Sequence, residues 1–475
     1  MKKSIRNALC LLLAALTLLC AAACAAGSGD GTETTVPAEA ATTVAEATTE
    51  SPYDDNGYLK DSLDPTLNFG GEDFTLLYWS DREHEEFVSE ELTGDAVSDA
   101  IFNRNANVEN RMGVKFNFIS TKGNASNISN FVTAVENSYN SADHSYDMIA
   151  AHSFTTASAA AKGLLLNLTA CDHLDWEKPW WPDNLIKQAT MNDKLYFASG
   201  DISANTIYVM YVTFFNKQLL DERKLESPYD LVANNKGTID KMFELTRDIY
   251  VDTNANSQKD DGDTYGLAVM ITSATDGLFS SCNIPILGEV DGHLDIVADV
   301  DKLSTVVDKF ITACWTTNGV VPISELESNA SAQVPYYSKQ FGNGEYCFLT
   351  QILYSVTTDS FRSMSNDYGI LPYPKFDKEQ ENYQTYVHDQ FTAIAIPVCV
   401  ADDRLEMVAN VIEAMSSDGR ERVKPVYYGI ALTGKYAKDP GSVEMLDKIC
   451  EGEADENAAD HKGRQAHEKM EAELC

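Results

Sequence analysis

The sequence lacks the short motifs that mark several common enzyme active sites. Its 475 residues contain no HExxH, GxSxG, P-loop or CxxC motif. These motifs position a zinc ion, a nucleophilic serine, a phosphate group or a redox pair. The sequence therefore gives no support for those reaction classes. Pairs of acidic residues are frequent, but a chain with 73 Asp and Glu residues produces them by chance, so they do not predict a glycosidase.

Basic residues are scarce as well. The chain has 36 Lys and Arg residues against 73 Asp and Glu residues, and its formal net charge is −37. Binding to nucleic-acid phosphates or to an anionic lipid surface requires clustered basic side chains. This composition argues against nucleic-acid partners and against electrostatic adhesion to membranes.

Cysteines are present but show no useful spacing. Three of the ten occur at or before Cys24, and the others are scattered: Cys171, Cys282, Cys314, Cys347, Cys399, Cys450 and Cys475. Their odd number and the absence of a close pair indicate neither a disulfide framework nor a zinc site. Since most have apolar neighbours, we predict that they are small core residues.

The amino terminus has the pattern of an exported lipoprotein. Lys2, Lys3 and Arg6 precede an uncharged apolar run over residues 8–19, and no stop-transfer segment follows. The sequence Ala-Ala-Ala-Cys that ends at Cys24 resembles a lipobox, with Ala21 where Leu is usual. We predict a signal peptide over residues 1–23 and lipidation at Cys24; an ordinary cleaved signal is the alternative. Residues 24–58 are predicted to form a disordered tether, which places the protein on the extracellular face of the cell membrane.

The first part of the body alternates apolar runs of strand and helix type. The patterns predict strands over 74–81, 114–120 and 146–152, and helices over 98–113, 131–139 and 154–163. This alternation is typical of an α/β fold with a mostly parallel sheet. Ligands of such sheets bind beyond the carboxyl ends of the strands, which here carry Trp79, Asp81, His152 and Ser153.

The second part repeats the same types of pattern without an internal repeat. We predict a strand running into a helix over 207–225 and helices over 238–250, 302–315 and 403–417. Later apolar runs consistent with strands cover 346–356, 368–374 and 391–398. A chain of this length is expected to form two domains.

The order of these motifs resembles a known family. The segments are NVENRMGVKFNF, YDMIAAH with GLLLNLT, KLYFASGDIS, YVTFFNKQLL, FGNGEYCFLT, YGILPYPK and TAIAIPV. Together they resemble the family 1 extracellular solute-binding proteins of carbohydrate ABC importers, in a lipoprotein branch common in clostridia-like bacteria. The resemblance covers residues 65–449.

The resemblance implies a two-lobed fold of the type II periplasmic-binding-protein kind, with a ligand cleft between hinged lobes. Lobe one would comprise residues 66–206 and 390–423, and lobe two residues 207–389 and 424–449. The hinges would lie near 206–209 and 388–390. Residues 450–475 do not resemble the final helices of the family, which leaves a truncation, a reading-frame error or a divergent disordered tail as explanations.

The resemblance also implies a function. The protein would capture a sugar or oligosaccharide as a monomer and deliver it to ABC permease subunits, without catalysis. It would contact the membrane through its lipid anchor alone. Two interpretations from other classes stay open: a surface-tethered glycan-processing enzyme and a ligand-sensing module for a signalling receptor.

A sugar site needs aromatic planes and charged or amide groups. The predicted strand ends and hinges supply both, and the candidate ligand-binding residues are Trp79, Asp81, His152, Ser153, Asp201, Tyr208, Tyr354 and Asp389. Core packing is the competing interpretation for each aromatic residue, and a turn or helix cap for Asp201. Trp180 and Trp181 are predicted to be packing residues.

An oxygen-rich loop suggests a metal site. Asp252, Asn254, Asn256, Gln258, Asp260 and Asp263 occupy positions one, three, five, seven, nine and twelve of a loop of EF-hand type. Ser257 stands where that loop has Gly, and Asp263 where it has Glu. We predict a structural Ca²⁺ ion here; a polar loop without metal is the alternative.

Overall fold

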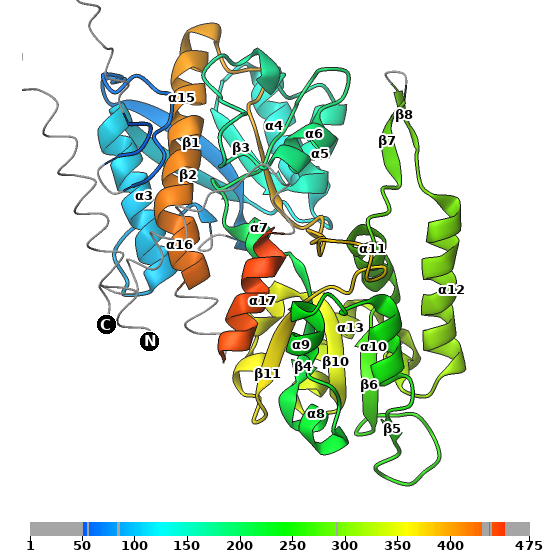
Figure 1. Cartoon of the computed structure of the whole chain (residues 1–475). Helices are drawn as coiled ribbons and strands as arrows, with labels where there is room; N and C mark the ends of the chain where they lie inside the picture. The colour runs from blue at the N-terminus through cyan, green and yellow to red at the C-terminus, as the bar shows by residue number, and fades with distance from the viewer. Residues whose placement is uncertain are drawn as a thin grey trace, which may run out of the picture. The chain divides into compact units, whose positions relative to one another are not determined.

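The computed structural model describes residues 51–54, 57–82, 86–290, 293–429, 437 and 439–451. The predicted signal peptide, Cys24, most of the predicted tether and all but the first residues of the atypical tail lie outside these residues. From Pro52 onward the chain forms one compact unit. This unit contains two main sheets, each flanked by helices (Figure 1). The predicted α/β class is confirmed.

The first sheet has the strand order β12-β3-β1-β2. Strand β1 is parallel to β2 and β3, and β12 is antiparallel to β3. Its strands are β1 (Glu72–Trp79), β2 (Val114–Thr121), β3 (Met148–His152) and β12 (Thr392–Ala395). Its helices are α3 (Ala96–Met112), α4 (Ile128–Ser141), α5 (Ser153–Ala161), α6 (Asp183–Ala189) and α15 (Asp402–Asp418).

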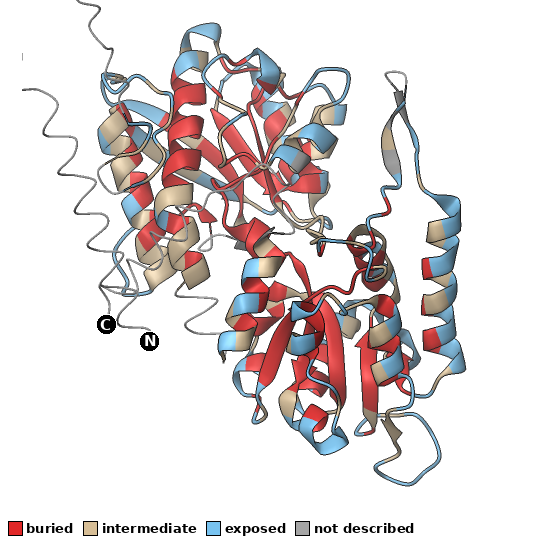
Figure 2. Ribbon diagram, in the orientation of Figure 1, coloured by how far each residue is buried: buried red, intermediate tan, exposed pale blue. Residues whose placement is uncertain are grey.

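Successive side chains of a strand point to opposite faces of the sheet. Apolar side chains of β1 point to both faces, so helices cover the sheet on both sides. Leu76 and Tyr78 of β1 face the core shared with α3 and α15, while Leu77 faces α4 and α5. Figure 2 shows β1, β3 and β12 as a mostly buried layer between partly exposed helices, whereas the edge strand β2 is largely exposed. Helix α3 ends where the sequence predicts, because Gly113 takes the left-handed conformation (φ 63°) that a side chain disfavours.

The second sheet has the order β11-β4-β10-β6-β5, with β9 beside β6. Strand β4 is antiparallel to both β10 and β11, whereas β6 is parallel to β10 and β9. Its strands are β4 (Tyr211–Asn216), β5 (Tyr250–Val251), β6 (Thr264–Val269), β9 (Val320–Pro322), β10 (Tyr346–Ile352) and β11 (Tyr368–Pro372).

Helices surround this sheet too. They are α8 (Lys217–Arg223), α9 (Pro228–Ala233), α10 (Ile239–Thr246), α11 (Ile271–Ser281), α12 (Val300–Thr316), α13 (Ala330–Gly342), α14 (Asp359–Arg362) and α17 (Pro440–Glu451). A hairpin of β7 (Leu287–Val290) and β8 (His293–Ile296) precedes α12. The sequence analysis did not predict this hairpin or α13.

The chain passes between the two sheets three times. The first crossover contains the short helix α7 (Asn205–Tyr208), so the strand predicted from residue 207 starts only at Tyr211. The second crossover leads from β11 to β12. The third leaves α15 through a π-helical turn, Gly419–Val423, and α16 (Lys424–Val426).

The first two crossovers lie side by side. The amide of His388 donates to the carbonyl of Val209 at 2.9 Å, and Met210 forms a bridge with Val387. Asn205 Nδ2 donates to the carbonyl of Gln390 at 3.0 Å. The predicted hinge residues thus occur in two adjacent segments that join the sheets.

One apolar cluster draws on both sides of these crossovers. It combines Ile101 of α3 and Ile207 of α7 with Phe214 and Leu349 of the second sheet and Tyr427 after α16. The two sheet-containing parts therefore share a core at the crossovers, which explains why they belong to one compact unit.

Most of the described cysteines are buried, as the sequence predicts. The six cysteines in the described part are free thiols, five of them buried, and burial raises the pKa of Cys282, Cys314 and Cys347 to about 12. No helix among the described residues is long and apolar enough to cross a bilayer.

Candidate functional site

Two predicted ligand residues end the parallel strands of the first sheet, but Trp79 lies in the core. Its side chain is 2% exposed, and its Nε1 donates to Thr392 Oγ1 at 3.0 Å. The ring packs edge-to-face against His152, with centroids 5.8 Å apart. The indole packs against His152 and has no exposed face on which a sugar ring could stack.

The chain after β3 presents an aromatic ring that the sequence analysis missed. His152 Nδ1 accepts from the backbone N–H of Phe154 at 3.2 Å and so caps α5. The rings of His152 and Phe154 lie 5.4 Å apart, and Phe154 is 50% exposed. Ser153 Oγ donates to the backbone carbonyl of Asp389, which ties this strand end to the second crossover. The exposed Phe154 ring therefore lies at the expected ligand-binding edge.

Asp389 faces this edge together with His388. His388 Nδ1 lies 2.6 Å from Asp389 Oδ1. This hydrogen bond, together with the charges of His388 and His152, lowers the pKa of Asp389 despite partial burial. The carboxylate is a pre-oriented acceptor at neutral pH.

Asp276 of α11 brings a second carboxylate into the same electrostatic environment. Desolvation raises the pKa of Asp276, the charge of His388 lowers it, and the charge of Asp389 raises it again. We call His152, Ser153, Phe154, Asp276, His388 and Asp389 the crossover site. It combines the exposed Phe154 ring with two carboxylates, two imidazoles and the Ser153 hydroxyl.

A stack of rings supports the crossover site from the second sheet. Tyr211 lies between Tyr386 and His388, with centroid distances of 5.3 and 5.6 Å and interplanar angles of 25° and 29°. Burial raises the pKa of Tyr386 to about 12. Local sequence patterns do not predict this stack, because it depends on the pairing of two crossovers.

The predicted tyrosines meet on the other side of the first crossover. Tyr208 packs edge-to-face on Tyr354 at 5.6 Å and on Tyr427 at 4.3 Å. Tyr208 is buried and Tyr354 is half-buried against the shared core. The structure thus brings Tyr208 and Tyr354 together, as a packed pair.

The remaining acidic candidates have structural partners elsewhere. Asp81 accepts from the Gly123 amide at 3.0 Å and from Asn124 Nδ2 at 2.7 Å, so it holds the loop before α4. Asp201 is buried and forms ion pairs with Arg420 at 3.0 Å and Lys424 at 2.7 Å. Asp201 lies in a turn, as its competing interpretation predicts, and its carboxylate also fixes the third crossover.

Trp180 and Trp181 are confirmed as packing residues. Both are buried, and their indole N–H groups donate to the two carboxylate oxygens of Glu413 at 2.9 and 3.0 Å. Burial raises the pKa of Glu413 to about 7 although both hydrogen bonds lower it. The pair anchors the chain before α6 on α15.

The Asp252–Asp263 loop folds around its own oxygen atoms. Asp252 accepts from the amides of Asn256 and Ser257 at 3.2 and 2.7 Å, and Asn254 Nδ2 donates to Asp260 at 3.0 Å. The Gln258 carbonyl, expected to be a metal ligand, accepts from Tyr250 at 3.0 Å. Ser257 takes φ 62°, the conformation that favours Gly at this position.

Asp263 closes the loop from inside the protein. It is fully buried and accepts from the Tyr250 hydroxyl and the Thr253 amide, both at 2.9 Å, and from the Asp260 amide at 3.2 Å. No group of three or more His, Cys, Asp or Glu side chains in the described part of the chain is arranged to hold a metal ion. The loop oxygens fit Ca²⁺ only if the Asn amides rotate and the carboxylates release their N–H partners.

Several solved structures resemble this fold weakly. A family 1 extracellular solute-binding protein from Bifidobacterium longum subsp. infantis is 12% identical, covers 81% of this chain and 88% of its own, and has a TM-score of 0.48. The maltose-binding periplasmic protein of Listeria monocytogenes, solved with maltose, is 14% identical and has a TM-score of 0.49. The match covers 80% of this chain and 85% of that protein. A cyclo/maltodextrin-binding protein solved with maltotetraose is also 14% identical, with a TM-score of 0.49. The match covers 80% of this chain and 86% of that protein.

The sequence comparisons find nothing further. No protein-family model matches the chain, and no curated protein matches it. The three TM-scores given above are all below 0.5.

Proposed function

We propose that this protein is an extracellular, lipid-anchored binding protein that captures a sugar or oligosaccharide and delivers it to an ABC permease. The observation that carries the proposal is the crossover site. Its exposed Phe154 ring and the Asp389 carboxylate lie where two paired segments join the sheets, and Asp276 of α11 interacts electrostatically with His388 and Asp389. The motif order described above supports the same family.

The chemistry of the site suits a carbohydrate. A sugar ring has an apolar C–H face that can stack on Phe154, and hydroxyl groups that can donate to carboxylate oxygens. Residues from both sides of the crossovers would reach one ligand when the lobes approach each other. Such a ligand stabilises the closed state because its contacts are complete only there.

The proposal also includes the location of the protein and its partners. Cys24 would carry the lipid, residues 24–58 would act as the tether, and the closed monomer would dock on the permease. We also propose a structural Ca²⁺ ion in the Asp252–Asp263 loop, supported by the number of oxygen atoms that gather there.

The test is a calorimetric titration with neutral mono- and oligosaccharides, followed by chromatography of the incubated sugar. Saturable binding with intact sugar would support capture. Hydrolysed sugar would replace capture with the enzyme interpretation, and the absence of binding by any sugar would remove the carbohydrate assignment. Uptake by cells that carry the permease would separate transport from sensing.

A further inference from the structure

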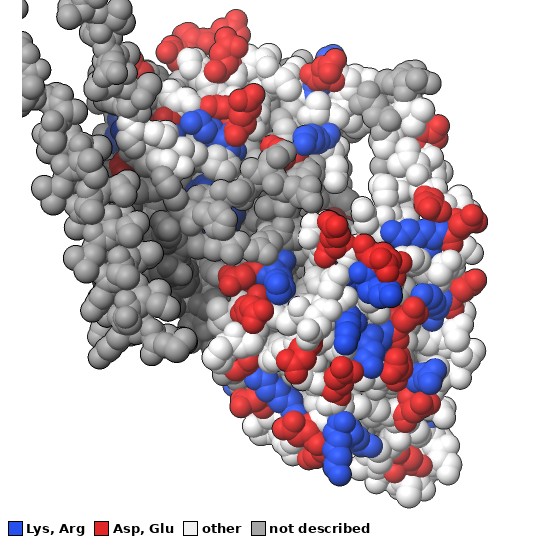
Figure 3. Space-filling model, in the orientation of Figure 1, with Lys and Arg blue, Asp and Glu red and all other residues white. Residues whose placement is uncertain are grey.

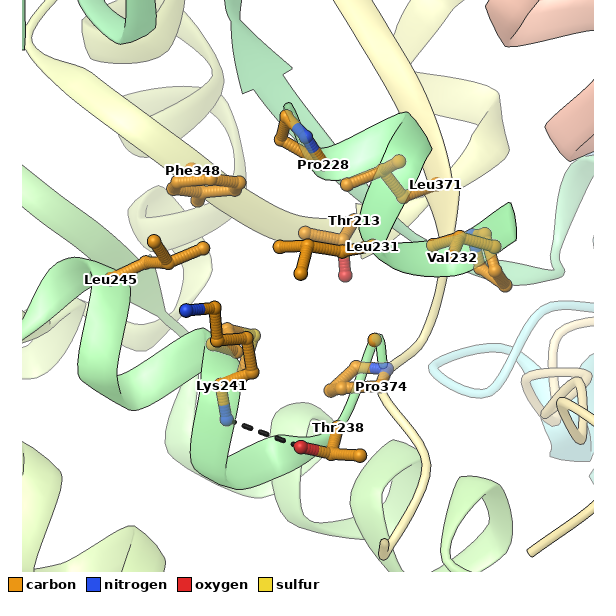
Figure 4. A pocket seen from close by; sticks show the side chains of 13 residues that line it. Thr213, Pro228, Leu231, Val232, Thr238, Lys241, Leu245, Phe348, Leu371 and Pro374 are labelled. Atoms are coloured by element: carbon orange, nitrogen blue, oxygen red, sulfur yellow. Dashed lines mark hydrogen bonds between the residues drawn. The ribbon is translucent and has the colours of Figure 1, made fainter. Parts of the chain in front are cut away.

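A cavity lies in the part of the chain built on the second sheet. It has a volume of about 50 Å³ and opens between α9, α10 and the strands β4, β10 and β11. Figure 4 shows its lining, which is mostly apolar and includes Leu231, Leu245, Phe348 and Leu371. None of the crossover-site residues contributes to it.

One polar atom of this lining has no partner. Thr213 of β4 is 3% exposed, and its Oγ1 makes no hydrogen bond to any of the described residues. A buried hydroxyl without a hydrogen-bond partner destabilises the folded protein. Thr213 therefore offers a donor and an acceptor to a molecule inside the cavity.

The other polar groups of the lining are engaged. Lys241 Nζ forms ion pairs with Glu226 and Glu244, both at 3.1 Å. Thr238 Oγ1 accepts from the Lys241 backbone amide at 3.2 Å, the dashed line in Figure 4. Charges of both signs alternate over the surrounding surface in Figure 3. A charged occupant would find no uncompensated partner here.

The size and polarity of the cavity limit its occupant. A water molecule needs about 10–15 Å³ and two to four polar partners. The cavity therefore has room for about three to five water molecules. Of its lining side chains, Thr213 supplies the hydroxyl that has no partner among the described residues. Water alone would leave most of its hydrogen bonds unmade, whereas a compact alkyl group would fill the remaining space.

We propose that this cavity binds a small neutral molecule with a branched alkyl body and one hydroxyl or carbonyl group, which pairs with Thr213. The site is separate from the sugar site and does not depend on the proposed function. Isobutanol is the probe, because its alkyl group fits the apolar walls and its hydroxyl can reach one partner.

The test measures the thermal midpoint and saturation-transfer NMR of the full chain during titration with isobutanol. Alcohols destabilise proteins in general, so Leu245→Phe, which fills the cavity from its half-buried rim, is the matched control. We expect a saturable stabilisation of the wild type relative to L245F. Thr213→Val should weaken the apparent affinity about 2- to 10-fold, the loss of one hydrogen bond. Isobutyrate and isobutylammonium should give no saturable difference.

The isosteric variant also tests the site without ligand. Since Thr213 Oγ1 has no hydrogen-bond partner among the described residues, T213V should leave the thermal midpoint unchanged or raise it. Destabilisation by T213V would show that a bound water already satisfies the hydroxyl and would overturn the proposal. So would an absence of NMR saturation transfer, or equal isobutanol affinity in wild type and T213V.

Discussion

The crossover site and the Asp252–Asp263 loop are both rich in oxygen atoms, yet they use them differently. In the loop, the backbone amides and side chains of the loop itself satisfy Asp252 and Asp263. In the crossover site, Asp389 and Asp276 come from distant segments and share His388 as their neighbour, beside an exposed ring. Carboxylates that are close in sequence tend to stabilise their own loop, whereas those assembled by the fold can serve a ligand.

The largest expected effect is on the stability of the loop. Asp263→Ala leaves the partners of a fully buried carboxylate unpaired, and we expect the free energy of unfolding to fall by about 2–4 kcal/mol. Denaturant unfolding measures it. Asn254→Ala, an exposed control in the same loop, should change stability by less than about 0.5 kcal/mol. Equal effects would mean that Asp263 is not the residue that closes the loop.

Calcium tests whether the loop binds a ligand as well. Ca²⁺ at 100 times its Kd would add about 2.7 kcal/mol to the stability of the wild type, and Asp252→Ala should abolish that gain. Thermal unfolding with and without Ca²⁺ measures both. If Ca²⁺ leaves the wild-type midpoint unchanged, the loop is satisfied by its own hydrogen bonds and the calcium proposal fails.

In the crossover site the main effect should be on affinity. Asp389→Ala removes a charged acceptor, and we expect sugar affinity to fall about 10- to 100-fold, because hydrogen bonds to charged groups contribute about 1.5–3 kcal/mol. Titration calorimetry measures the loss. Asp81→Ala is the contrasting variant: Asp81 holds the Gly123 loop, so affinity should change less than about 2-fold. A larger loss in D81A would return Asp81 to the site.

The smallest effect concerns pH and has opposite signs for the two carboxylates. The pKa of Asp389 is lowered in the folded protein, so its contribution to stability is present above about pH 3.9 and is lost as the pH falls further. The pKa of Asp276 is raised, so its contribution declines as the pH rises from about 3.9.

Urea unfolding across the acidic range measures these slopes. Asp389→Asn should flatten the acid loss of stability, and Asp276→Asn should remove the opposing slope. If the free energy of unfolding depends on pH in the same way in both variants, Asp389 and Asp276 do not share His388 as a charged neighbour.

The same contrast explains what the sequence predicted well. Local patterns located β1, β2, β3, α3 and α15, because apolar period and the stop at Gly113 depend on near neighbours in the chain. They also placed His152 and Ser153 at a strand end. The Asp252 loop was found for the same reason, since all its residues are adjacent.

What the sequence missed depends on contacts between distant segments. Phe154 looked like an ordinary helix residue, but its ring is exposed at the start of α5, where His152 caps the helix. The Tyr211–Tyr386–His388 stack requires two crossovers to pair. Trp79 occurred at the expected strand end, but its burial and its hydrogen bond to Thr392 show that it faces the core.

The most direct test of capture at the crossovers is small-angle X-ray scattering of the wild type and of the Phe154→Ala, Asp389→Ala double variant, each with and without the sugar that calorimetry finds to bind best. The account predicts that the sugar reduces the radius of gyration of the wild type and leaves the double variant unchanged at the same concentration. Sugar binding without any change in the wild-type radius, or an equal reduction in the double variant, would contradict closure on a ligand held by the crossover site.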